Sequence, residues 1–495
     1  MLRRGLFVLA VVALITASVP SCAWKFASMA DSRGSDNGIH LDTFSTIINL
    51  VNSENVDFVV FQGDAVSGSS SDTTLASQMD TWLAEINKLN CPWYYTPGNH
   101  EIHTSTAEVD VLRPRVNQPM NGPPGYEEFV FSFDYQNAHF VFLNSDHYDE
   151  EHKVQWQWLA TDLAGTMKTH TFVMAHDPAY PMGAHIGSSL DAYPTERDDF
   201  WGVMTNADVR MYFCGHEHFY GRAQHGSIIQ VINGTCGAPL ATGHSGTIAQ
   251  YHYVVVEVNG YDVHCLAKNE SGDVIDSWDY SIEPPVPISS VKALQDNLPV
   301  YLADKVATVG NDQLTSTVYI EDQDFSSGIK VNAATPSVKQ GDKIHVSGTM
   351  GSSQTERVIN SPTVTLHTGG PYPVPHPLGM VTRDFGGGSL NDYTPGITGG
   401  IGAHNTGLLV AIWGKVTYVN TTGKYFYLDD GFNWQDGSGY KGIQVYCGGR
   451  PVGNTLTMPA QDTCAVVTGI SSRKISGSNT IPVLRPRKQS DIVPY

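Results

Sequence analysis

The strings Gly98-Asn99-His100-Glu101 and Gly215-His216-Glu217-His218 decide the fold that the sequence predicts. Each string follows a short apolar run, over residues 93–96 and 209–214, of the kind that forms a buried strand. Ligands of open α/β sheets bind beyond the carboxyl ends of the strands, where loop side chains meet in one crevice. The two strings therefore predict a polar site at one edge of a sheet.

Outward from these strings, residues 24–283 alternate apolar runs with segments of helical periodicity. The predicted strands lie at 25–30, 58–62, 93–96, 171–175, 209–214, 228–233, 251–258 and 261–267, with a hairpin over 129–135 and 139–144. The predicted helices lie at 41–52, 74–89 and 154–163. This alternation predicts an α/β domain with sheets inside and helices outside.

Polar side chains follow these strands in an order that suits a pair of metal ions: Asp31, Asp64, Asn99, His176, His216 and His218. A carboxylate can place its oxygens on two ions, which suits Asp64, while neutral imidazoles and amide oxygens complete each shell. Any one of these residues alone has an ordinary explanation, such as an aspartate in a turn or a packed histidine. Their joint occurrence at strand ends favours a metal site.

The ordered set resembles the calcineurin-like metallophosphoesterase superfamily, and Phe219-Tyr220-Gly221-Arg222 is similar to its purple acid phosphatase branch. The resemblance covers residues 24–283 and implies a four-layer α/β/β/α sandwich that binds two divalent or trivalent ions of Fe, Zn or Mn. It implies that His100 is catalytic and lies beside the substrate. It also implies one ion held by Asp31, Asp64 and His218, and a second held by Asp64, Asn99, His176 and His216.

Two positions depart from the family pattern. The superfamily often has Asp-x-His at the first strand, whereas Asp31-Ser32-Arg33 places an arginine there, and arginine stays protonated and cannot bind a cation. Purple acid phosphatases have a tyrosine three residues past the bridging aspartate, where this chain has Ser67. The first ion thus lacks one protein ligand, and no purple iron chromophore is expected. Arg33 is predicted either to bind a substrate phosphate or to form a structural salt bridge.

These residues predict a metal-dependent phosphoester hydrolase, a phosphomonoesterase or phosphodiesterase, that uses a metal-activated hydroxide. His100, positioned by Glu101 or another neighbour, is expected to protonate the leaving oxygen or to stabilise charge on the phosphoryl group. The alternative is a glycan- or surface-binding protein on a degenerate phosphoesterase scaffold, which the missing ligand favours. The substrate is expected to be a phosphorylated small molecule or polymer.

The chain after the Pro-rich segment 284–287 loses helical periodicity and contains two similar stretches about 100 residues apart. They resemble oligonucleotide/oligosaccharide-binding (OB) barrels, with a larger β-sandwich as the alternative. We predict a repeat over 288–368, a Gly/Pro-rich connection over 369–406 and a second repeat over 407–495. The barrels could bind a glycan or cell-surface ligand. The formal net charge of −20 argues against nucleic acid, which prefers a basic surface.

The first 23 residues have the pattern of a signal peptide, with Arg3 and Arg4, an apolar core and small residues at a cleavage site. They predict a secreted or extracytoplasmic protein, with a lipid anchor on Cys22 as a variant, and no transmembrane segment in the mature chain. Export permits disulfides, for which the best candidate pairs are Cys447 with Cys464 and Cys236 with Cys265. Cys214 lies in an apolar run and is predicted to be a buried thiol.

Overall fold

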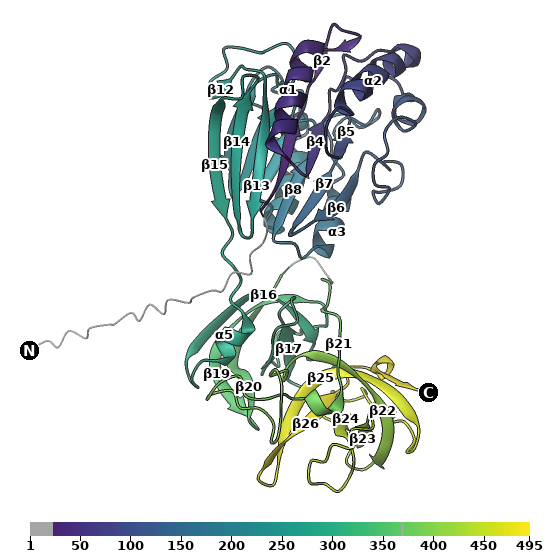
Figure 1. Ribbon diagram of the computed structural model, residues 1–495, viewed down its shortest axis with the longest axis vertical. Coiled ribbons are helices and arrows are strands. Elements are labelled where there is room, and N and C mark those ends of the chain that lie inside the picture. Colours follow the sequence, from purple (N-terminus) through teal and green to yellow (C-terminus); the bar gives the residue numbers. More distant parts are fainter. Residues whose placement is uncertain (1–22, 368–370) are drawn as a thin grey trace, which may run out of the picture. The chain divides into compact units, whose positions relative to one another are not determined.

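The computed structural model describes residues 23–367 and 371–495 (Figure 1). The predicted leader, Cys22 included, lies outside the described residues except for Ala23. The chain forms two compact units: the first runs to Trp156 and resumes over Lys168–Glu283, and the second comprises Gln157–Met167 and Pro284–Tyr495. No helix in the described part of the chain is long and apolar enough to cross a bilayer.

The first sheet of the first unit has the strand order β15-β14-β13-β1-β4-β5. Strands β1, β4 and β5, which the sequence predicted, run parallel to one another. Strand β13 pairs with β1 in antiparallel orientation. The strands are β1 (Trp24–Met29), β4 (Phe58–Gln62), β5 (Trp93–Thr96), β13 (His252–Asn259), β14 (Asp262–Asn269) and β15 (Val274–Ser281).

The second sheet has the order β12-β10-β11-β9-β8-β7-β6. Strands β7, β8, β9 and β11 run parallel, and β6 and β7 form the predicted hairpin. The strands are β6 (Phe131–Tyr135), β7 (Ala138–Phe142), β8 (His170–Met174), β9 (Met211–Cys214), β10 (Tyr220–His225), β11 (Ile228–Asn233) and β12 (Thr247–Ile248).

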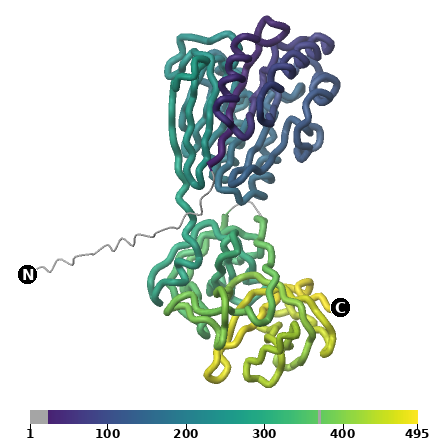
Figure 2. The backbone as a smooth tube through the Cα atoms, in the orientation of Figure 1, coloured from purple at the N-terminus to yellow at the C-terminus, as the bar shows by residue number. Residues whose placement is uncertain are grey.

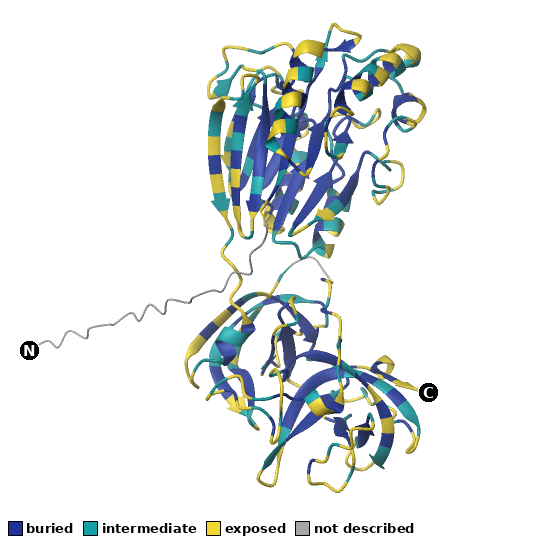
Figure 3. Cartoon of the chain, in the orientation of Figure 1, coloured by how far each residue is buried: buried dark blue, intermediate teal, exposed yellow. Residues whose placement is uncertain are grey.

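The two sheets pack face to face on a core rich in phenylalanine. On β1, Phe26 points into this core and contacts the ring of Phe172 on β8 at 5.1 Å between centroids, whereas Ala27 faces the opposite core. That opposite core lies under α1 (Leu41–Glu54) and α2 (Asp72–Ile86). On the far side, α4 (Pro194–Asn206) packs Phe200 against Tyr212 of β9. The predicted α/β/β/α layering is confirmed, and the inner strands are the most buried part of the unit (Figure 3).

Shorter elements complete the helices and strands. They are β2 (Arg33–Gly34), β3 (Gly38–Ile39), α3 (Trp156–Gly165), α5 (Ile288–Lys292), the π-helical turn η1 (Ala107–Leu112), and the 3₁₀ turns η2 (Leu190–Ala192), η3 (Thr382–Asp384) and η4 (Gln489–Asp491).

The second unit contains two five-stranded barrels (Figure 2). The first closes in the order β16-β17-β18-β20-β19, and β18 runs parallel to β20. The second repeats this order as β22-β23-β24-β26-β25, and β24 again runs parallel to β26. It closes through the pairing of β22 with β25. This shared order confirms the predicted pair of OB-like barrels and rules out one larger β-sandwich. Strands β21 and β27 flank the second barrel.

The strands of the second unit range in length from 2 to 13 residues. They are β16 (Pro299–Val309), β17 (Val318–Glu321), β18 (Gly328–Val331), β19 (Lys343–Ser353), β20 (Glu356–Leu366), β21 (Leu378–Gly379), β22 (Leu409–Asn420), β23 (Tyr425–Asp429), β24 (Ile443–Tyr446), β25 (Cys464–Ser476), β26 (Asn479–Arg485) and β27 (Ile492–Pro494).

Both predicted disulfides are wrong, because all four cysteines are free. Cys447 follows β24 and Cys464 begins β25, and β26 lies between these strands. The Cys236 thiol donates to the Ala30 carbonyl at 2.8 Å, whereas Cys265 is buried on β14 opposite Val256. Cys214 is a fully buried thiol, as predicted.

Candidate metal centre

The structure brings all eight predicted site residues into one connected group at the carboxyl ends of the strands. Each of β1, β4, β5, β8 and β9 ends in the loop that supplies its donors, and Arg33 lies on β2. Asp31, Asp64 and His216 have positive φ angles of 59°, 52° and 67°. Left-handed backbone is costly for residues with a side chain and is typical of functional sites. Donors from loops of both sheets come together at the carboxyl ends of the strands, as Asp64 does with His176 and Asp31 with His218.

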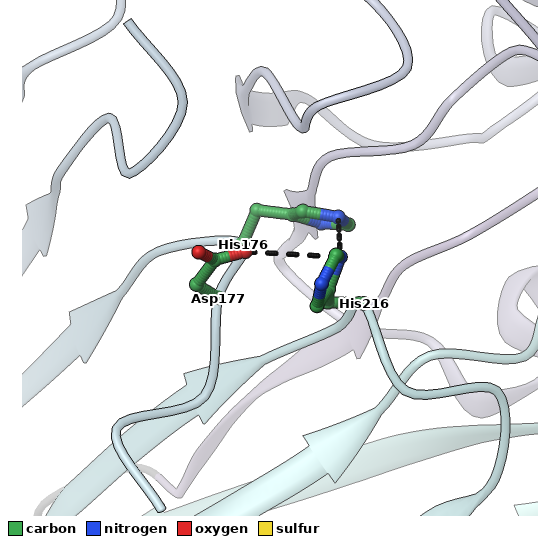
Figure 4. Close-up of side chains that lie close together, drawn as sticks. All are labelled: His176, Asp177 and His216. Carbon is green, nitrogen blue, oxygen red and sulfur yellow. Dashed lines mark hydrogen bonds and ion pairs between the residues drawn. The ribbon is translucent and has the colours of Figure 1, made fainter. Parts of the chain in front are cut away.

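The predicted second-ion donors converge on one another. His176 Nε2 lies 3.3 Å from both Asp64 Oδ1 and Asn99 Oδ1, and His216 Nδ1 lies 3.1 Å from Asn99 Oδ1. The two imidazole nitrogens are 3.3 Å apart (Figure 4). These four donors come from four different loops.

Hydrogen bonds fix the tautomers of both histidines. His176 Nδ1 donates to the Gln62 carbonyl at 2.7 Å, so the Nε2 of the neutral ring carries a lone pair. His216 Nε2 donates to the Ser188 carbonyl at 3.0 Å, which leaves the lone pair on Nδ1. The Asp64, Asn99, His176 and His216 donors thus face one another without a proton between them, and a cation at their centre would satisfy all four.

The predicted first-ion donors are Asp31, Asp64 and His218. Asp31 Oδ1 is buried without a hydrogen-bond partner and lies 3.6 Å from His218 Nε2, while Asp31 Oδ2 accepts the His216 backbone N–H at 3.1 Å. A buried carboxylate oxygen without a partner is costly, and a metal ion is one way to satisfy it.

Arg33 lies against this first set. Its Nη2 is 3.2 Å from His218 Nε2, and its Nε is 3.6 Å from Asp64 Oδ2 and has no hydrogen-bond partner. The guanidinium therefore supplies positive charge on the side where the family pattern has a histidine ligand. Ser67, at the place of the missing tyrosine, turns its hydroxyl to the Gly34 carbonyl at 2.7 Å and is no substitute ligand.

Burial and local charge set the protonation of these donors. Burial lowers the pKa values of His176 and His216, and neighbouring imidazoles lower them more. The pKa of His216 falls further below its ordinary value than that of His176. Burial and Arg33 lower the pKa of His218 to about 4. Burial alone would raise the pKa of Asp64, but the positive charge of His176 and His100, when these rings are protonated, holds it below its ordinary value. The three imidazoles are thus neutral and able to bind a cation at neutral pH.

His100 is positioned beside Asp64 rather than in either donor set. Its Nδ1 donates to the Ser67 carbonyl at 2.7 Å, and its Nε2 lies 3.8 Å from Asp64 Oδ2. The side chain is 25% exposed, so Nε2 remains accessible to a substrate. Of the two alternatives, Glu101 or another neighbour, the structure shows the second, because the Ser67 carbonyl positions this ring.

Glu101 instead holds the loops together. Its carboxylate accepts backbone N–H groups of Asp64 at 3.0 Å, Val66 at 3.0 Å and Gly98 at 2.9 Å. Glu217, at the corresponding place in the second string, accepts those of Met182, Gly183 and His185 at 2.6, 2.8 and 3.0 Å. Each of the two sequence strings therefore contains a predicted metal donor and a glutamate. The glutamate binds backbone N–H groups in the loop that follows a different strand.

Replacing Glu101 with alanine is expected to destabilise the first unit by about 3 kcal/mol or more, because three buried N–H groups lose their acceptor. Chemical denaturation monitored by tryptophan fluorescence measures this change. Glu101→Gln keeps one acceptor oxygen and is the matched control, with a smaller loss. Equal midpoints for Glu101→Ala and the wild type would contradict the assigned role.

The sequence did not indicate Asp177 and His152. Asp177 Oδ1 is buried without a partner, 3.7 Å from His216 Nδ1 (Figure 4), and its Oδ2 lies 2.6 Å from His152 Nδ1. The His185 ring lies 4.0 Å from that of His216. Asp177 directly follows a predicted ligand, which is the one signal that could have identified it.

The residues fit a dinuclear metal centre. The second-ion set has four convergent donors, the first-ion set has a buried carboxylate oxygen that lacks a partner, and Asp64 contributes to both. His176, Asp177 and His216, and Asp31, Asp64 and His176, are each close enough to share an ion.

Residues 35–220 match the model of the calcineurin-like phosphoesterase family. These residues therefore contain a calcineurin-like phosphoesterase domain, in agreement with the sheet arrangement and the donor set. This confirms the superfamily predicted from the two strings.

Purple acid phosphatases and other phosphatases are among the proteins to which this chain is similar. The chain is 26% identical over 190 residues to Fe(3+)-Zn(2+) purple acid phosphatase 12 of Arabidopsis thaliana, covering 36% of this chain and 40% of that protein. It is 27% identical over 234 residues to phosphoenolpyruvate phosphatase of Allium cepa, covering 44% and 45%. The chain thus spans less than half the length of these relatives. A solved structure, purple acid phosphatase PPD1 of yellow lupin, aligns with a TM-score of 0.44 at 18% identity over 53% of this chain and 54% of that one.

Proposed function

We propose that the first unit hydrolyses phosphoesters in a metal-dependent reaction. The observation that carries this proposal is the convergence of the Asp64, Asn99, His176 and His216 donors, with no proton to share among them. The similarity to purple acid phosphatases supports the same reaction class. Bound ions would neutralise the phosphoryl charge and make water a better nucleophile.

The remaining residues have distinct tasks in the proposed reaction. The Arg33 guanidinium, at the open side of the first donor set, binds a non-bridging phosphate oxygen. Protonated His100 presents Nε2–H to the leaving oxygen, because its Nδ1 is already bound to the Ser67 carbonyl. The attacking water loses a proton to solvent and forms the new bond to phosphorus, and the bond to the leaving oxygen breaks. His100 donates its proton to this oxygen and takes up another from solvent.

Two synthetic substrates test the function. The metal-stripped protein is given Mn²⁺, Zn²⁺ or Fe²⁺ and assayed with an aryl phosphate and a bis-aryl phosphate. We expect hydrolysis of at least one ester to depend on added metal, and the ratio of the two rates to distinguish monoesterase from diesterase. A degenerate scaffold predicts no hydrolysis under any of these conditions, and that result would refute the proposal.

Arg33→Ala is expected to lower kcat/KM by about 10- to 100-fold, mostly through KM, because a charge-assisted hydrogen bond to phosphate is worth about 1.5–3 kcal/mol. Steady-state kinetics on the aryl phosphate measures this loss. Arg33→Lys retains the charge without the planar fork and should be intermediate. Unchanged KM in Arg33→Ala would favour the alternative of a structural salt bridge to Asp64.

Export is part of the proposal, because the first 23 residues combine a basic start, an apolar core and small residues. Fractionation of cells that produce the full-length chain tests it. Recovery of a shortened chain outside the cytoplasm is expected, and full-length chain confined to the cytoplasm would contradict export.

A further inference from the structure

A second group of metal-ligand side chains lies on the first barrel, outside the proposed catalytic centre. Asp304 is on β16, His345 is on β19, and His367 follows β20. The backbone pairs Ile344 with Leu366, so the two histidines are offset neighbours across β19 and β20. One donor atom from each of the three side chains lies within 4.8 Å of the other two.

A local irregularity of β16 brings the carboxylate to this place. The pairing of β16 with β19 shifts register between Leu302 and Lys305, and Asp304 within this shift has φ 54°. Such a bulge re-aims a side chain, and a non-glycine residue with positive φ is costly enough to suggest a role.

The contacts among the three side chains cannot all be hydrogen bonds. His367 Nε2 lies 2.5 Å from His345 Nε2 and 3.0 Å from Asp304 Oδ1. If His367 Nε2 carries a proton, it can point to only one of these two atoms. If His345 carries the proton instead, the lone pair of His367 Nε2 faces the carboxylate oxygen. One cation between the three atoms would satisfy all of them.

We propose that Asp304, His345 and His367 bind a divalent first-row transition metal ion of the Zn²⁺ class. Two imidazoles and one carboxylate are typical ligands of such ions, and water would complete the shell because the site is partly exposed. Binding through His345 Nε2 leaves the proton on Nδ1, and the weak contact from the Asp304 backbone N–H to Nδ1, 3.4 Å long, is then lost.

This site would join three strand segments at one end of the first barrel. It shares no residue with the proposed catalytic centre, so it can be tested whether or not the first unit is an enzyme. It also differs from a surface pair such as His264 and Asp279, whose 2.6 Å contact involves one imidazole and one carboxylate.

Zinc counting on the full-length chain tests the site. Metal-stripped wild type, the double variant His345→Gln/His367→Gln and the control His264→Gln are dialysed against Zn²⁺, and bound zinc is measured by plasma mass spectrometry. The double variant is expected to bind one zinc ion per chain less than the wild type, and His264→Gln the same number. The same loss of one ion is expected in an Asp64→Asn background. Equal zinc content in the double variant and the wild type would overturn the proposal.

A measurement on the wild type guards against misfolding of the variant. Zn²⁺ should slow the modification of His345 and His367 by diethyl pyrocarbonate, read by peptide mass spectrometry, and leave that of His264 unchanged. If Zn²⁺ changed the modification rate of none of the three histidines, the proposal would also be overturned.

Discussion

Asp64→Asn is expected to lower kcat/KM for an aryl phosphate by about 10³-fold or more. Asp64 lies close to donors of both sets: its Oδ1 is 3.3 Å from His176 Nε2, and Asp31, Asp64 and His176 each offer a donor atom within 4.8 Å of the others. Asparagine keeps the shape and the acceptor for the His100 backbone N–H but removes the negative charge that would bridge two cations. Steady-state kinetics and metal content of the same preparation give the result.

Asp279→Asn is the matched control for this substitution, because Asp279 is an exposed aspartate of β15. It should leave both kcat/KM and metal content unchanged. Asp64→Asn protein with wild-type activity at full metal occupancy would contradict a bridging role for Asp64.

His100→Ala is expected to lower kcat by about 10²- to 10³-fold with little change in metal content, since His100 lies outside both donor sets. A general acid matters most when the leaving group is basic. The loss should therefore be larger for an alkyl phosphate than for a nitrophenyl phosphate, whose leaving group needs no proton.

His103→Ala is the control for the neighbouring ring, which lies 6.0 Å from that of His100 between centroids. It should retain most of the activity. If His100→Ala lost bound metal while kcat per bound metal stayed the same, His100 would be a ligand rather than the acid.

Local pattern was sufficient to predict the elements that carry the site. The bounds of β4, β5 and β11 match the predicted strands to the residue, because each is a short apolar run between polar turns. The barrels were recognisable because two stretches repeat the same strand pattern. Helix α4 was missed, since its buried side chains Phe200, Trp201 and Met204 are few and irregularly spaced.

Contacts between distant loops were beyond the reach of the sequence. The acceptor roles of Glu101 and Glu217 depend on backbone N–H groups that lie more than thirty positions away in most cases. Asp304 and His345 lie 41 positions apart in the sequence, and His345 and His367 lie 22 positions apart, so no short motif marks this group. Arg33 was predicted at the site from its place beside Asp31, but its position against His218 required the fold.

Stoichiometric reconstitution tests the central claim most directly. Metal-stripped protein is titrated with Mn²⁺ or Zn²⁺ while aryl phosphate hydrolysis is followed, with the Asp64→Asn variant treated in parallel. The structure predicts that activity rises with bound metal, reaches a plateau once both donor sets are filled, and stays about 10³-fold lower or more in the variant. Hydrolysis that is independent of added metal, or fully retained in Asp64→Asn, would contradict a two-metal phosphoesterase centre.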